Sequence, residues 1–223
     1  MSESSDPRPS AYLFPKWTNK LPVFFATGSF LFLCFLIFVF WYWVSPKNTD
    51  VGFAPKQPIP YSHKLHAGEL GIDCRYCHIN VERSSAATIP PTQICMNCHK
   101  VIKTESPHIK KLQESYEKNI PMKWVKVHKL PDYVYFDHSR HVNSGVSCYT
   151  CHGRIDRMEV VHQVQPLSMS WCLDCHRNPD KNLRPKEFIT NLDWSSPDAL
   201  KIGQAIRKEK HISPREDCNT CHR

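Results

Sequence analysis

The stretch YSHKLHAGELGIDCRYCH, residues 61–78, places two histidines three positions apart, ahead of a Cys-x-x-Cys-His sequence. The stretch FDHSRHVNSGVSCYTCH, residues 136–152, repeats this order about 75 positions later. Each stretch is followed by one further Cys-x-x-Cys-His sequence. Because self-similarity at a fixed spacing indicates a repeated structural unit, we expect both regions to build the same kind of site.

Ten of the eleven cysteines occur in five copies of Cys-x-x-Cys-His. This motif attaches c-type haem: the two thiols form thioethers with the porphyrin, and the adjacent imidazole is the proximal ligand of the iron. The pattern therefore predicts five covalently attached haem c groups. The attaching cysteines are Cys74 and Cys77, Cys95 and Cys98, Cys148 and Cys151, Cys172 and Cys175, and Cys218 and Cys221, followed by the proximal ligands His78, His99, His152, His176 and His222.

Zinc, disulfide bonds and thioredoxin-like redox pairs are the competing interpretations of these cysteines. Between Cys77 and Cys95 lie 17 residues, a spacing found in paired Cys-x-x-Cys zinc sites. Five pairs, however, do not divide into four-cysteine sites, and neither zinc nor disulfides explain a histidine after every pair. A thioredoxin-like site would need a surrounding βαβ pattern, which the sequence lacks.

Two further histidine pairs, His63/His66 and His138/His141, occupy the same place ahead of a haem motif. Residues three apart on a helical turn point to roughly the same side. We therefore expect these four histidines to be distal ligands, each pair serving two neighbouring haems.

The distal ligand of the fifth haem is less narrowly determined. His128 in WVKVHKLPDYVYF immediately precedes the second repeat and is the preferred candidate. The alternatives are His211, seven residues before Cys218, then His162 and Met169.

The segment LPVFFATGSFLFLCFLIFVFWYWV, residues 21–44, contains no charged residue. As a helix it would be about 36 Å long, enough to cross a hydrocarbon core of about 30 Å. No small-x-small cleavage site follows it, which favours an uncleaved membrane anchor over a signal peptide. Arg8, Lys16 and Lys20 precede the span, so the positive-inside rule predicts a cytoplasmic N-terminus in a bacterial inner membrane and a periplasmic haem domain.

The expected organisation is a cytoplasmic tail (1–20), a transmembrane helix (21–45), a linker (46–60) and a pentahaem domain (61–223). Within the domain we expect two-haem modules at 61–99 and 136–176, with the fifth haem at 211–223. Ser106-Pro107 predicts a helix to about residue 118 with Ile109, Leu112 and Tyr116 on one face. Ser196-Pro197 predicts another helix to about residue 209. The fold class is therefore mostly irregular with short α-helices, a multihaem cytochrome c of class III-like modules.

The net charge of +8 is expected to neutralise haem propionates rather than to bind nucleic acid. Haems with both axial positions filled leave no open iron for substrate. The sequence thus predicts an electron relay without catalytic residues of its own.

The stretches YSHKLHAGELGIDCRYCH, IPPTQICMNCH, LPDYVYFDHSRHVNSGVSCYTCHGRID and PLSMSWCLDCHRNP resemble the pentahaem cytochrome subunit of Alternative Complex III, from about residue 60 to residue 223. The resemblance implies electron flow from quinol to a periplasmic cytochrome c, a copper protein or an oxidase. It also implies as partners an iron–sulfur/molybdoenzyme-like subunit, multi-span quinol-site subunits and a monohaem cytochrome c.

Two other classes compete with this reading. A self-sufficient anchored quinol dehydrogenase feeding a periplasmic reductase shares the single span, but usually has four haems. A pentahaem nitrite reductase would carry a Cys-x-x-Cys-Lys motif, whereas all five motifs here end in histidine.

Overall fold

A computed structural model describes residues 14–43 and 50–222. Most of the expected tail, residues 1–13, lies outside the described residues, as do 44–45 of the expected span and 46–49 of the expected linker. The chain forms two compact units, Met1–Asn48 and Thr49–Arg223.

The N-terminal unit is one long apolar helix. α1 (Leu21–Trp43) follows a 3-10 turn, η1 (Lys16–Lys20), and both belong to one 28-residue segment with a mean hydropathy of 2.6 over its most apolar window. Its phenylalanine, leucine and tryptophan side chains are exposed all round the helix. Within the described part of the chain, this is the one helix long and apolar enough to cross a membrane.

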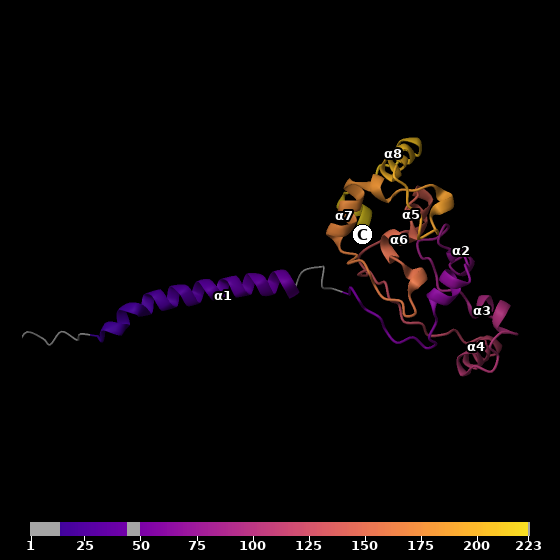
Figure 1. Ribbon diagram of the computed structural model, residues 1–223, viewed down its shortest axis with the longest axis horizontal. Helices are drawn as coiled ribbons and strands as arrows, with labels where there is room; N and C mark the ends of the chain where they lie inside the picture. The colour runs from indigo at the N-terminus through magenta and orange to yellow at the C-terminus, as the bar shows by residue number, and fades with distance from the viewer. Residues whose placement is uncertain (1–13, 44–49, 223) are drawn as a thin grey trace, which may run out of the picture. The chain divides into compact units, whose positions relative to one another are not determined.

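The C-terminal unit consists of short helices joined by irregular chain (Figure 1). Its described residues form no strands, only the isolated bridges Val134–His222 and Val146–Leu183. The expected fold class is confirmed. The helices are a π-helical turn η3 (Lys64–Glu69), α2 (Cys74–Cys77), α3 (Thr92–His99), α4 (Pro107–Glu117), α5 (His138–Ser144), α6 (Cys148–His152), η4 (Ile155–Arg157), α7 (Met169–Arg177), η5 (Pro179–Asn182), η6 (Lys186–Phe188), α8 (Ala199–Glu209) and α9 (Cys218–Cys221).

Helix α4 begins at Pro107 after the N-cap residue Ser106 and buries Ile109 and Leu112, as the sequence predicts. Tyr116, expected on the same face, is 37% exposed. Ser115 is buried, and its hydroxyl donates a 2.6 Å hydrogen bond to the Ile120 carbonyl just beyond the helix.

Helix α8 begins at Ala199 rather than at Pro197. The Asp198 amide donates to the Ser196 hydroxyl at 3.2 Å, and this local turn occupies the residues expected to form the first helical turn. Gly203 lies where the helix crosses η5, and a Cβ atom there would collide with the backbone of Asp180. Glycine therefore permits the close approach of the two elements.

The apolar core built by protein side chains is small. Nine apolar side chains are buried among the described residues, and one cluster of them contains Ile59, Met96, Ile109 and Leu112. Single domains usually depend on such burial for stability. A core of this size is consistent with porphyrin rings supplying much of the apolar interior.

Candidate haem centres

All five Cys-x-x-Cys sequences lie on helical turns, in α2, α3, α6, α7 and α9. Residues three apart on a helix share a face, so both thiols of each pair can approach one ligand. Three of these helices are capped by a preceding side chain: Asp73 accepts from the Arg75 amide, Ser147 from the Tyr149 amide, and Ser168 from the Trp171 amide. None of the eleven cysteines, all of which lie among the described residues, forms a disulfide bond.

The described residues contain no group of three or more histidine, cysteine or acidic side chains arranged to hold a bare metal ion. A structural zinc site uses four such ligands. Haem iron needs only two axial ligands from the protein, and the structure supplies histidines in pairs.

The second histidine of each predicted pair faces a proximal histidine. The ring centres of His66 and His99 are 6.2 Å apart, and those of His141 and His176 are 6.1 Å apart. An imidazole nitrogen binds a metal at about 2.0 Å and the ring centre lies about 1 Å farther, so two imidazoles on opposite sides of one iron have centres about 6 Å apart. Both pairs therefore fit a haem iron held from two sides.

Backbone carbonyls orient most of these imidazoles. Fixing the hydrogen on Nδ1 leaves the Nε2 lone pair free for a metal. The Nδ1 atoms lie 2.7–3.2 Å from carbonyl oxygens in seven cases: His66 to Ser62, His78 to Thr88, His99 to Ile102, His138 to Ser85, His141 to Asp137, His176 to Arg215 and His222 to Tyr133.

Burial favours the neutral state that a metal requires at two of the candidate ligands, His63 and His152. It lowers the pKa of His63 to about 4, with a smaller contribution from His78. It lowers the pKa of His152 to about 3, with smaller contributions from His128 and His138. The Nδ1 atom of His63 is buried without a hydrogen-bond partner among the described residues.

His128 lies against the proximal histidine of the third motif. Its Nε2 atom is 3.4 Å from Nδ1 of His152, and the two rings are nearly perpendicular, at 85°, with centres 4.3 Å apart. Burial lowers the pKa of His128 below its ordinary value. His128, the preferred candidate for the fifth distal position, therefore contacts Nδ1 of His152, the predicted proximal ligand of the third motif.

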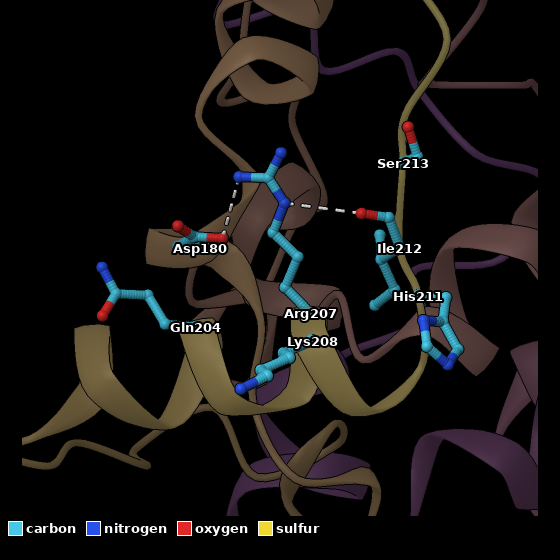
Figure 2. Close-up of a pocket in the computed structure, with 7 residues that line it drawn as sticks. All are labelled: Asp180, Gln204, Arg207, Lys208, His211, Ile212 and Ser213. Carbon is cyan, nitrogen blue, oxygen red and sulfur yellow. Dashed lines mark hydrogen bonds and ion pairs between the residues drawn. The ribbon is translucent and has the colours of Figure 1, made fainter.

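The other candidates for that position lie at the surface or partly buried. Figure 2 shows His211 in a pocket at the end of α8, near Arg207, which bonds the Asp180 carboxylate and the Ile212 carbonyl. Met169 is 62% exposed at the start of α7. His162 is partly buried.

Comparison with known proteins agrees with this geometry. A family model described as cytochrome c7 and related cytochrome c matches residues 134–223. The chain is also 29% identical over 188 residues to the multihaem cytochrome c subunit of menaquinone reductase from Nitratidesulfovibrio vulgaris (strain Hildenborough), covering 82% of each chain. The chain is thus similar to multihaem cytochromes c. Covalently bound haem c is the cofactor that this similarity implies.

The two repeats share an aromatic contact that the sequence analysis missed. The Tyr61 ring lies edge-on to His63 and stacks on His66, with ring centres 4.9 Å and 4.5 Å away. Phe136 makes the equivalent contacts in the second repeat, with its ring centre 4.7 Å from that of His138 and 4.6 Å from that of His141. The signal was present in the sequence as an aromatic residue two positions before each histidine pair.

The two repeats also contact each other. In one direction, the amides of His138 and Ser139 donate to the carbonyls of Ser85 and Ser84. In the other, the amide of Lys64 donates to the carbonyl of Met158, which follows the third motif. Each histidine pair is thus held by the segment that follows the first haem motif of the other repeat.

The C-terminal motif is bonded to the rest of the C-terminal unit from two sides. The Nδ1 atom of His176 donates to the Arg215 carbonyl and Arg177 pairs with Glu216, so this end lies beside α7 (Figure 1). The Tyr135 amide donates to the Cys221 carbonyl at 2.8 Å. These contacts hold the fifth motif against the segment that leads into the second repeat.

Proposed function

We propose that this cytochrome binds five haems and relays electrons between a membrane quinone pool and a second redox partner. The observation that carries the proposal is the combination of five Cys-x-x-Cys-His turns with two imidazole pairs 6.1–6.2 Å apart. In this arrangement, His66 is the distal partner of His99, and His141 that of His176. His63 and His138 supply two further distal positions.

The residues of the chain explain why its role is transfer rather than substrate chemistry. Haem c, when bound, supplies one-electron chemistry whose potential depends on axial ligands and burial. His66 with His99, and His141 with His176, would each hold one iron and leave it no open position, and the carbonyl bonds to Nδ1 hold these imidazoles in place. Covalent attachment through ten cysteines prevents loss of the cofactor outside the cytoplasm.

The quinone link is supported by the name of the relative, a subunit of menaquinone reductase. That name describes transfer of electrons into menaquinone, whereas the resemblance to Alternative Complex III describes transfer out of quinol. Both place a quinone at one end of the relay. The cytochrome would then work beside multi-span quinone-site subunits, an iron–sulfur/molybdoenzyme-like subunit and a monohaem cytochrome c.

The apolar helix supports an anchored location. With α1 in the bacterial inner membrane and the N-terminus in the cytoplasm, the haem domain lies in the periplasm, where c-type haem is attached. The single anchor would also suit a self-sufficient quinol dehydrogenase that works without the other subunits.

The test uses the native membrane complex. Intact mass and pyridine-haemochrome absorbance should show five haems per chain, and fewer would overturn the pentahaem assignment. Haem reduction by menaquinol, or haem oxidation by menaquinone, should occur in the complex and reveals the direction of flow. If neither reaction occurs, the quinone link is wrong. Quinol reaction by the isolated chain would favour the self-sufficient alternative.

A further inference from the structure

The contacts between the two repeats are reciprocal. In each repeat, the residue after the first histidine of the His-x-x-His pair donates its amide to the other repeat. The acceptor in each case is the carbonyl six residues beyond the proximal histidine of the first motif. These bonds run from Lys64 to Met158, at 3.0 Å, and from Ser139 to Ser84, at 3.2 Å. Equivalent positions of the two repeats therefore make equivalent contacts.

A second reciprocal contact has the same register. A Cβ atom on Gly68 would collide with the Asp156 carbonyl, and the Asn143 side chain donates to the Glu82 carbonyl at 2.8 Å. Gly68 and Asn143 each lie five residues after the first histidine of their pair, and both carbonyls lie four residues beyond a proximal histidine. An interface in which one position contacts another and the reverse contact also occurs has a two-fold axis. The two repeats are thus related by an approximate two-fold axis.

Helices α2 and α6, which carry the first motif of each repeat, lie next to this axis. The thiols of Cys74 and Cys148, with which these helices begin, are in hydrogen-bonding contact. Two consecutive residues bind both helix starts. The Ser147 hydroxyl donates to the Ile189 carbonyl at 2.9 Å, and the hydroxyl of the next residue donates to the Asp73 carboxylate at 2.8 Å. The attachment sites of the first and third haems are therefore neighbours across the axis.

Helices α3 and α7, which carry the second motif of each repeat, lie on the outer sides of this central pair. Figure 1 shows α3 beside α2 and α7 beside α6, with α2 and α6 between them. The Asn97 side chain on α3 donates to the Tyr76 hydroxyl on α2 at 2.9 Å. Beyond α7, Asn182 donates a 3.2 Å bond to the Cys175 sulfur, and the next residue forms a backbone bridge with Val146, just before α6. The second haem site thus adjoins the first, and the fourth adjoins the third.

The fifth motif extends this row beyond α7. The Nδ1 atom of His176 donates a 2.7 Å bond to the Arg215 carbonyl, and Arg177 pairs with Glu216 at 3.0 Å. These two acceptors lead directly into α9, and the C-terminus lies next to α7 in Figure 1. The fifth haem site therefore adjoins the fourth.

We propose that the five haems stand in the order second, first, third, fourth, fifth, and that electrons cross between the two repeats from the first haem to the third or the reverse. The proposal rests on the proposed function, because it takes every motif as a haem site. A haem held by two thioethers lies against its own helical turn, so neighbouring turns hold neighbouring haems. The order in space differs from the order in the chain because the two-fold axis places the first motif of each repeat innermost. The second and fifth haems are then the two ends of the relay.

The direct test locates the irons in the wild-type, haem-loaded chain within its native complex. A cryo-electron microscopy map assigns each iron to a motif through the cysteines that bind its porphyrin. We expect the nearest-neighbour irons to be second and first, first and third, third and fourth, and fourth and fifth. Five irons with another pair of motifs adjacent across the repeats would overturn the order and leave the five-haem assignment intact. Fewer than five irons would contradict that assignment, and the proposed order with it.

Redox titration of two variants provides a test in solution. Loss of a distal imidazole changes the potential of its haem, and therefore the charge that neighbouring haems experience as they are reduced. His66→Leu acts on the second haem, which has one neighbour in the proposed order, and His141→Leu acts on the fourth, which has two. We therefore expect a shifted midpoint potential at one further haem in His66→Leu and at two in His141→Leu. His108→Leu, at an exposed position of α4, is the control and should shift none.

The same number of shifted neighbours in His66→Leu and His141→Leu would overturn the order, because haems arranged in chain order would give two in both variants. Intact mass of each variant counts its haems separately, so a wrong order is distinguished from a missing haem. If either variant does not fold, the iron positions of the wild-type chain still decide the order.

Discussion

Replacing His66 by leucine should open one axial position at one haem. The 6.2 Å between the ring centres of His66 and His99 leaves room for a single iron. Each distal imidazole thus serves one of five haems, so His66→Leu should convert about one fifth of the haem iron from low-spin to high-spin. His141→Leu should give the same fraction, because its partner ring is 6.1 Å away. The double variant should give about two fifths.

The assay is electron paramagnetic resonance of the oxidised protein, with spins quantified against haem measured as pyridine haemochrome. Carbon monoxide binding to the reduced protein provides a second readout, because it requires an open iron position. His108→Leu, which replaces an exposed histidine on α4, is the control and should remain low-spin. A wholly low-spin spectrum in both His66→Leu and His141→Leu would show that these histidines do not bind iron and would refute the reasoning from ring distances.

Three further predictions concern stability, acid sensitivity and attachment to the membrane. Gly203→Ala should lower the free energy of unfolding by about 1–3 kcal/mol, since the clash with the Asp180 backbone outweighs the helix propensity gained; an unchanged or raised denaturant midpoint would contradict this. Hydrogen bonding to Arg75 lowers the pKa of Asp73 to about 2, so the contribution of this carboxylate to stability is present above about pH 4 and lost as the pH falls towards 2. Asp73→Asn should therefore lose less stability than the wild type on acidification, and identical acid-unfolding profiles would contradict this role of Asp73. Replacing residues 1–48 by a cleavable export signal should release the haem-loaded domain from the membrane fraction, and persistence of the domain there would show that α1 is not its main anchor.

The two repeats show how much of the histidine-pair geometry local sequence could predict. His63 and His66 lie one helical turn apart, and their orientation depends on neighbours within four residues: Tyr61 stacks on the second ring and the Ser62 carbonyl binds its Nδ1. The same local contacts recur around Phe136 and Asp137. Local spacing therefore carried enough information to predict which side chains turn towards the haem motifs.

The start of α8 shows where local reasoning was less accurate. Ser196-Pro197 has the composition of a helix start, but the Ser196 hydroxyl forms a turn first. This side-chain hydrogen bond to the backbone competes with helical geometry, and periodicity does not register such a bond.

The sequence by itself predicts the covalent chemistry of this chain, because attachment of haem depends on two thiols and an imidazole within five consecutive residues. Local spacing likewise identified four histidines suited to the distal side. Only the tertiary structure decided which imidazole meets which: His66 faces His99, His141 faces His176, and His128 faces the outer nitrogen of His152. Axial pairing is a contact between segments far apart in the chain, and its geometry depends on how the whole domain packs around its cofactors.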